Sequence, residues 1–303
     1  NEPEYKLLSD APAKEDLFGR RELAKRVARV LMSIDASDGY VLGIQGSWGS
    51  GKTTLLRFIC DVLDALPEHE RPVMVQFNPW WFPPDENLVG FFLRQLAAAL
   101  GRVSAELELR RVSRLLELLE TGLTLADYVP GVGAGAKIGA TIARGISAKT
   151  AASAARRASD LAATRAELAR ILSSQKRRIV VVVDDLDRLE EPQLRQVFSI
   201  LKAIGDLPNV LYLVAYDRQR TSRALDEVAQ KTSYLEKVIQ ASIEIPPISE
   251  REQLNMMISG VENAAGVHLT SEQRSRLLTI WSRVLKYVVH TPRQAKRLTH
   301  SFG

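Results

Sequence analysis

Residues 46–53 read Gly46-Ser47-Trp48-Gly49-Ser50-Gly51-Lys52-Thr53 and directly follow the apolar run Val41-Leu42-Gly43-Ile44. The octapeptide matches the pattern G-x-x-x-x-G-K-[ST] at every fixed position, and a helical run begins behind it. Glycines in such a loop let backbone N–H groups curl around a chain of phosphates, and the following helix adds the positive end of its dipole. The alternative is a glycine-rich turn that matches by chance. We interpret the stretch as a phosphate loop that binds a nucleoside triphosphate.

Two side chains of this loop carry the expected chemistry. Lys52 is placed to reach and neutralise the terminal phosphates, which gives it a catalytic role as well as a binding role. Thr53 offers its hydroxyl to a Mg²⁺ ion that accompanies the nucleotide. The predicted nucleotide-binding residues of the loop and helix start are Ser47, Trp48, Gly49, Ser50, Gly51, Lys52, Thr53 and Thr54.

A second acidic motif follows the most apolar run of the chain. Ile179-Val180-Val181-Val182-Val183 leads into Asp184-Asp185-Leu186-Asp187-Arg188, and the unalternated run predicts a central strand covered on both faces. Asp184 ends this strand, where a phosphate-loop protein needs a carboxylate that holds Mg²⁺. Asp185 is then placed to polarise the attacking water, although its side chain is one methylene shorter than glutamate, which favours slow hydrolysis. Asp187 and Arg188 equally fit a local salt bridge.

Three further runs complete the predicted sheet. Val73–Phe77 lies between the two motifs and indicates the P-loop division in which an extra strand separates the phosphate-loop strand from the Asp-bearing strand. Val210–Ala215 is the next strand, and Asp217 after it either senses the γ-phosphate or caps the following helix. Ile243–Ile245 is the last. We expect a three-layer α/β domain with a parallel five-stranded sheet.

The segment between the motifs has a different composition. Residues 102–178 hold 14 Lys and Arg against 7 Asp and Glu, whereas the whole chain has a net charge of +5. A glycine-rich stretch at 129–136 favours a helical hairpin inserted in the α/β domain, which we call the frame. Its basic character fits a nucleic acid, an anionic membrane surface or simply a solvated helix face.

Bulk properties bound the cellular setting and the domain plan. The chain has one cysteine, no recognisable secretory signal and no apolar run long enough to span a membrane, so we expect a cytoplasmic protein, with peripheral membrane association as the alternative. We predict an α/β domain over residues 1–247, with the insert at about 102–178, and a helical lid over 248–303. The lid ends in mid-helix without a cap, so we expect a piece of a longer protein.

Several blocks together resemble the KAP family of P-loop NTPases. They are the phosphate loop with its tryptophan, Phe77-Asn78-Pro79-Trp80, Asp184-Asp185-Leu186-Asp187-Arg188, Tyr234–Gln240 and Thr291-Pro292-Arg293-Gln294-Ala295-Lys296-Arg297-Leu298. The resemblance implies an ATPase allied to the STAND and AAA+ classes, within the water-activating ASCE division. Members often carry membrane hairpins between the two motifs, and bacterial members are frequently tied to phage defence. The insert of this chain departs from that pattern, because its charged residues and its glycines do not fit transmembrane helices.

The resemblance also implies roles in and near the lid. Arg293 resembles a lid arginine that contacts the nucleotide, with Thr291 as the cap of its helix and Pro292 at the first helical position. Trp48 either leans over the nucleotide or wedges against the aromatic residues of Asn78–Trp81, and we favour the wedge. Lys237 is either a surface lysine or a residue at the nucleotide or a neighbouring subunit.

These observations predict an ATPase that hydrolyses Mg²⁺–ATP to ADP and phosphate and uses the nucleotide state to control assembly or an effector. The expected partners are further copies of the chain or an effector protein. A very slow or non-hydrolysing ATP/ADP switch is the alternative from a different class. A nucleic-acid or membrane-surface module acting through the basic insert is the third reading.

Overall fold

A computed structural model describes residues 16–81, 88–103, 163, 165–226 and 234–300. Its five strands are β1 (Tyr40–Gln45), β2 (Val73–Phe77), β3 (Ile179–Val183), β4 (Val210–Tyr216) and β5 (Ala241–Glu244). They form one sheet in the order β2-β3-β4-β1-β5, and every pair is parallel. This confirms the predicted α/β fold with a parallel five-stranded sheet.

The sheet order locates the strand that separates the two motifs. β4 lies between β1, which carries the phosphate loop, and β3, which carries Asp184. β2 stands between the motifs in the sequence but occupies the sheet edge beyond β3. The motif-bearing strands are therefore not adjacent, and their carboxyl ends face each other across the end of β4.

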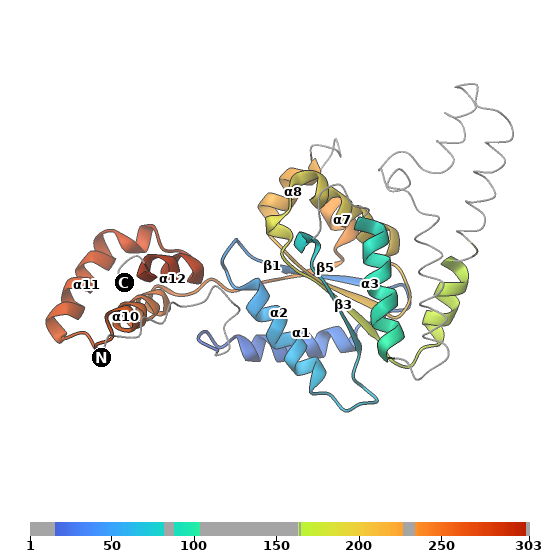
Figure 1. Ribbon diagram of the computed structural model, residues 1–303, viewed down its shortest axis with the longest axis horizontal. Coiled ribbons are helices and arrows are strands. Elements are labelled where there is room, and N and C mark those ends of the chain that lie inside the picture. The colour runs from blue at the N-terminus through green and yellow to red at the C-terminus, as the bar shows by residue number, and fades with distance from the viewer. Residues whose placement is uncertain (1–15, 82–87, 104–162, 164, 227–233, 301–303) are drawn as a thin grey trace, which may run out of the picture.

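Helices cover both faces of the sheet, as expected from strands that are buried throughout (Figure 1). On one face α1 (Arg20–Ser33) and α2 (Lys52–Asp64) pack against alternate residues of the central strands, such as Val180 and Leu213. On the other face lie α3 (Leu88–Val103), α7 (Glu191–Ile204), α8 (Arg218–Asp226) and α9 (Tyr234–Val238). β3 contributes residues to both clusters and is buried throughout, which confirms the predicted cover on both faces, although β4 and not β3 is the middle strand of the sheet.

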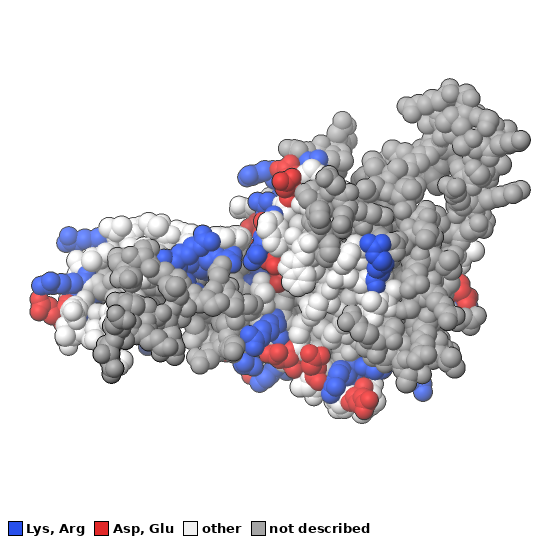
Figure 2. All heavy atoms as spheres, in the orientation of Figure 1, with Lys and Arg blue, Asp and Glu red and all other residues white. Residues whose placement is uncertain are grey.

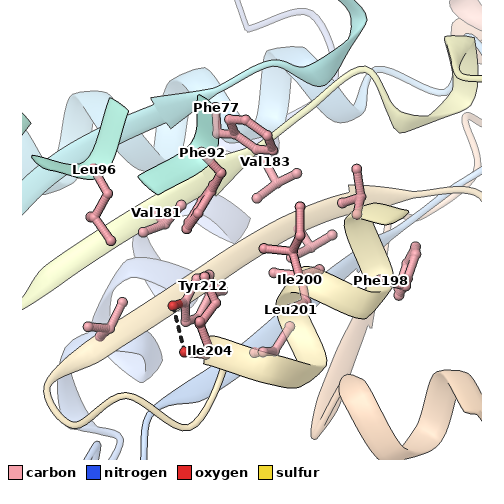
Figure 3. Packing of buried hydrophobic residues seen from close by; sticks show 14 of the residues in the cluster. Phe77, Phe92, Leu96, Val181, Val183, Phe198, Ile200, Leu201, Ile204 and Tyr212 are labelled. Atoms are coloured by element: carbon pink, nitrogen blue, oxygen red, sulfur yellow. Dashed lines mark hydrogen bonds between the residues drawn. The ribbon is translucent and has the colours of Figure 1, made fainter. Parts of the chain in front are cut away.

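Aromatic packing fixes α3 and α7 on that second face (Figure 3). The Phe92 ring meets Phe77 of β2 edge-on, with 4.9 Å between the ring centroids. Tyr212 of β4 is fully buried, and its hydroxyl donates a 2.8 Å hydrogen bond to the carbonyl of Ile204 at the end of α7. A buried tyrosine hydroxyl without such a partner would cost free energy, so this bond also fixes the position of the helix end.

A helical lid follows β5 and forms a separate small core. It consists of α10 (Glu250–Ala265), α11 (Ser271–Arg283), the 3₁₀ turn η4 (Leu285–Tyr287) and α12 (Pro292–His300). Met257, Trp281, Val289 and Ala295 make up its buried centre. Capping boxes at Ser249 and Thr270 start the first two helices. Figure 1 places the lid beside the end of the frame from which α2 begins.

Most of the insert lies outside the described residues, including the predicted hairpin turn at 129–136. Before the undescribed part of the insert, α3 is described through Val103, and after it helical residues are described at 163 and 165–174. Within the described ranges, no helix combines the length and the apolar character needed to cross a membrane.

Two arginines at the end of the basic segment have structural partners. Arg178 donates a 2.6 Å hydrogen bond to the carbonyl of Ile34, just after α1, and Arg177 donates a 3.0 Å bond to the carbonyl of Arg71. Cations near helix C-termini offset the negative end of the helix dipole. Arg177 and Arg178 therefore brace the frame, and reversing their charge would disturb folding as well as any partner.

The single cysteine gives a prediction that tests this packing. Cys60 lies on α2, and burial raises the pKa of its thiol to about 11. The thiolate is the reactive form, so at pH 8 the folded protein should react with dithiobis-nitrobenzoate about 100-fold more slowly than an ordinary cysteine. The chain unfolded in guanidinium is the control and should react at the ordinary rate. A native rate equal to the unfolded one would show that the thiol is open to solvent.

Candidate nucleotide-binding site

The phosphate loop leaves the end of β1 and enters α2 at Lys52. Gly49 and Gly51 have φ values of 80° and 94°, a left-handed conformation that glycine adopts without a steric cost. A Cβ atom on Gly51 would also collide with the guanidinium of Arg20. Both positions therefore favour glycine, although the motif fixes only Gly51 and leaves the position of Gly49 variable.

Lys52 is 7% exposed, and its ammonium group is saturated by acceptors. The Nζ atom donates to the carbonyl oxygens of Gly46 at 2.9 Å and Ser47 at 3.1 Å, and it forms an ion pair with Asp187. The expected local pair between Asp187 and Arg188 is therefore wrong. Asp187 instead lies within the site next to Lys52, and its side chain is only 10% exposed.

Thr53 and Asp184 come together as the magnesium prediction requires. Their side chains are hydrogen-bonded, and Asp184 also accepts a 2.8 Å bond from the backbone N–H of Asp185. Burial raises the pKa of Asp184, while these two hydrogen bonds oppose the shift. A hydroxyl beside a carboxylate is a suitable donor set for Mg²⁺, which takes its remaining ligands from phosphate oxygens and water. No group of three His, Cys, Asp or Glu side chains that could hold a metal ion by themselves occurs in the described part of the chain.

Two side chains hold the Asp185 carboxylate: Asn78, which directly follows β2, and Arg188, which lies shortly after β3. Asn78 Nδ2 donates to one carboxylate oxygen at 2.7 Å, and Arg188 Nε contacts the other at 2.9 Å. Asn78 is itself oriented by the backbone N–H of Trp80, which donates to its side-chain oxygen at 3.1 Å. Asp185 has a left-handed φ of 60°, which is uncommon for a non-glycine residue but accessible to Asp and Asn. The predicted water-polarising carboxylate is therefore in the site, with both oxygens engaged.

Trp48 contacts the lid, so the favoured wedge against Asn78–Trp81 is wrong. The guanidinium carbons of Arg293 and Arg297 lie 4.5 Å and 5.0 Å from the centroid of its ring, and Trp48 as a residue remains 42% exposed. Both arginines belong to α12, which begins as predicted with Thr291 as its cap, since Gln294 N–H donates to Thr291 Oγ1 at 3.3 Å. Arg293 thus reaches the site and stacks on the loop tryptophan.

Asp217 and Lys237 lie elsewhere. Asp217 accepts a 3.1 Å hydrogen bond from the backbone N–H of Arg220 in the first turn of α8, which is the capping role left open by the sequence. It is absent from the described lining of the cavity, so the geometry gives no support to a γ-phosphate sensor. Lys237 is an exposed residue of α9.

A cavity of 460 Å³ joins these groups between the frame and the lid. The frame contributes Lys52, Thr53, Asp184, Asp185 and Asp187, and the lid contributes Met256, Pro292, Arg293 and Lys296. Leu17, Phe18 and Phe58 give one part of the wall an apolar character, which suits a nucleobase. Figure 2 shows Lys and Arg side chains gathered on the lid where it faces the frame.

Sequence reasoning missed Arg20 as well as Asp187. Arg20 is 6% exposed at the start of α1, and its Nη1 donates a 2.6 Å hydrogen bond to the carbonyl of Ser50 beneath the phosphate loop. Burial lowers the pKa of its guanidinium. The block Leu17-Phe18-Gly19-Arg20 by itself indicates only the start of a helix, where a charged residue is ordinarily exposed.

The residues present fit a magnesium nucleotide on two grounds. The left-handed Gly49 and Gly51 let the loop backbone curl so that successive N–H groups can face an anion, and Ser50 Oγ is a buried polar atom with no hydrogen-bond partner among the described residues. A buried hydroxyl without a partner is costly, and a phosphate oxygen would satisfy it. Thr53 and Asp184 supply the hard oxygen donors that magnesium takes.

Comparison with known proteins gives a family match, one related protein and several similar structures. Residues 20–303 match the family described as "KAP family P-loop domain". The chain is 28% identical over 265 residues to the "Phage T7 exclusion protein" of Escherichia coli (strain K12), covering 79% of this chain and 34% of that protein's length. Among solved structures, the ORC2 protein of Aeropyrum pernix (ADPNP-ADP complexes) aligns with a TM-score of 0.45 at 15% identity, over 98% of this chain and 65% of that one. A Walker-type ATPase of Pyrococcus abyssi aligns with a TM-score of 0.42 at 14% identity, over 97% and 74%.

Proposed function

This chain belongs to the KAP family of P-loop domains, and we propose that it binds Mg²⁺–ATP between its α/β frame and its helical lid and hydrolyses it to ADP and phosphate. One observation carries the proposal. Lys52, the Thr53–Asp184 pair and Asp185 line the same cavity, although they come from two motifs about 130 residues apart in the sequence. Residues 1–247 and 248–303 are the two units that we propose meet at the nucleotide.

Each residue has a proposed task that follows from its chemistry. Lys52 and the loop N–H groups bind the phosphates, and Thr53 with Asp184 hold Mg²⁺, which neutralises charge on the phosphate oxygens. Asp185 accepts a hydrogen bond from the attacking water and so orients it in line with the terminal phosphate. Asn78 and Arg188 each use one acceptor site of Asp185, so the carboxylate keeps further lone pairs for the water while these two neighbours hold it in place.

The direct test is phosphate release by the purified chain. With ATP and Mg²⁺ we expect steady turnover that falls to background when EDTA removes the metal. ADP should release no phosphate, because it lacks the terminal phosphoryl group that the proposed reaction removes. A chain that binds ATP stoichiometrically but releases no phosphate over many hours would exclude the hydrolase and favour the switch.

A nucleotide switch is the second candidate function. It is favoured by the ion pairs and hydrogen bonds that Lys52 and Asp185 already make within the chain. Lys52 is paired with Asp187, and Asp185 is held by Asn78 and Arg188, so the chain has a resting arrangement that ATP must rearrange. Such an arrangement suits slow turnover with lid closure controlling assembly or an effector. Gel-filtration mass with ATP, with ADP and without nucleotide separates a switch that assembles from a solitary hydrolase.

We also propose a cellular role, partners and a location for the protein. Similarity to a protein named for phage exclusion supports a part in bacterial anti-phage defence, with further copies of the chain or an effector protein as partners. The basic segment supports contact with nucleic acid or an anionic membrane surface, and the cytoplasm is the proposed location. Salt-sensitive binding that is lost on charge reversal at Arg156 and Arg157 would test that contact without disturbing the frame-bracing Arg177 and Arg178.

A further inference from the structure

The tip of the phosphate loop makes a close contact with the lid. Trp48 is covered by Arg293 and Arg297, one turn apart on α12, with ring-to-guanidinium distances of 4.5 Å and 5.0 Å. A cation over the face of a tryptophan is attracted by the ring quadrupole, most strongly for this ring type. Two arginines from one helix on one ring make a contact between the lid and the loop that binds phosphate.

The backbone next to Trp48 is also adapted to the lid. A Cβ atom on Gly49 would lie 2.9 Å from the Cβ of Arg293 and 3.0 Å from Thr291 Oγ1, closer than side chains tolerate. Gly49 therefore lets the capped start of α12 rest directly on the loop. Its left-handed φ of 80° reinforces the need for glycine at this position.

Between the described helices and strands, the larger contacts of the lid are internal to it, and Glu252 of α10 also interacts electrostatically with Arg20 of α1. The lid helices pack extensively only against one another, and a single extended connection joins them to β5 (Figure 1). The lid core of Met257, Trp281, Val289 and Ala295 is separate from both frame clusters. The position of the lid relative to the frame therefore depends strongly on the contact at Trp48 and Gly49.

We propose that Trp48 is a positioning residue that docks the helical lid on the phosphate loop through Arg293 and Arg297. Docking brings Arg293 and Lys296 into the wall of the nucleotide cavity. The loop thus acts both as the phosphate cradle and as the seat of the lid, and a lid that leaves the ring also leaves the nucleotide. The docking contact is made by the chain alone, whereas its effect on turnover rests on the proposed ATPase function.

Spin labels on the frame and the lid measure docking directly. Ser37→Cys and Ser275→Cys introduce exposed cysteines in a Cys60→Ser background, which removes the half-buried native thiol, so pulsed dipolar spectroscopy reports a frame-to-lid distance. Without nucleotide we expect one narrow distance distribution. Trp48→Leu should broaden it and lower the ratio of docked to undocked lid about 10-fold, whereas Trp48→Phe, which keeps a ring face, should retain most of the docked population.

Variants on the lid side show whether the ring and the arginines act together. Arg297→Met should loosen the lid and Arg297→Lys should loosen it less, because lysine keeps the cation. The double variant Trp48→Leu/Arg297→Met should lower docking no further than Trp48→Leu alone. Arg276→Met removes one lid cation elsewhere and Trp80→Leu removes another exposed tryptophan, so both controls should keep the native distance.

The outcomes separate the docking proposal from the proposed function. A native distance distribution in Trp48→Leu, or a Trp48→Phe variant as loose as Trp48→Leu, would overturn the docking role. If the native chain shows no ATP turnover but the docking results are as expected, the ATPase proposal fails and the docking role stands. If both hold, loss of docking should lower kcat about 10-fold in Trp48→Leu with a smaller change in KM, because Lys52 still binds the phosphates.

Discussion

Replacement of Lys52 by methionine is expected to lower the affinity for ATP at least about 100-fold and to remove measurable turnover. The phosphate oxygens would lose the charge-assisted hydrogen bonds that the Lys52 ammonium group donates. Two such bonds contribute about 3 kcal/mol to binding. Methionine keeps the length and the apolar stem of the side chain, so the packing of α2 changes little. Isothermal titration with ATP and phosphate release would measure the two losses.

The same variant leaves Asp187 without its cation, so its folding needs a separate control. Breaking a buried ion pair by removing one partner costs about 3 kcal/mol, whereas removing both charges is often nearly neutral. We therefore expect Lys52→Met to lower the melting temperature and Lys52→Met/Asp187→Asn to restore it without restoring ATP binding. Lys25→Met, which removes an exposed lysine from α1, should bind ATP like the native chain. Recovery of binding in the double variant would contradict the role given to Lys52.

The sequence predicted the parts of the site that are built from consecutive residues. The phosphate loop and the β3 strand with Asp184 at its end follow from local patterns, because glycine, β-branched and carboxylate positions each have a local physical reason. The cap at Thr291 followed for the same reason, since a hydroxyl one residue before a helix bonds a nearby N–H. These features needed no knowledge of which distant segments meet.

The pairing of charges across the site could not be predicted in this way. Asp187 lies three residues beyond Asp184 in the 3₁₀ turn η3 (Leu186–Arg188), which turns its carboxylate toward Lys52. Asp185 finds its partner Asn78 across the ends of β2 and β3. One signal was available, because three acids in four residues repel one another unless cations come from elsewhere. The only nearby cation in the sequence, Arg188, could satisfy one of them.

Trp48 illustrates the limit set by long-range folding. An aromatic residue in the phosphate loop and an aromatic cluster at the end of the next strand favoured a contact within the frame. The true neighbours, Arg293 and Arg297, lie about 245 residues further along the chain, and only the arrival of α12 at the loop tip brings them together. The helical lid was predictable from its periodicity, whereas the surface on which it rests was not.

Replacement of Asp185 by asparagine is expected to lower ATP turnover at least about 100-fold while ATP affinity stays within a few-fold of the native value. Loss of a group that orients or deprotonates the attacking water costs 10²- to 10⁴-fold in typical cases, about 3 to 5 kcal/mol. Asparagine also tolerates the left-handed φ of 60°, so the backbone at η3 should be preserved. Phosphate release and isothermal titration on the same preparation would separate catalysis from binding.

Asp187→Asn is the matched variant that shows which carboxylate acts on water. Both residues line the cavity and each is paired with one cation, but only Asp187 contacts Lys52. Removing its charge releases Lys52 from a competing anion, so Asp187→Asn should bind ATP at least as tightly as the native chain, because no bond to Asp187 must then be broken. Turnover in Asp187→Asn should accordingly stay well above that of Asp185→Asn. The reverse order, with Asp187→Asn inactive and Asp185→Asn active, would transfer the water-activating role to Asp187 and leave Asp185 as the group that holds Asn78 and Arg188 in place.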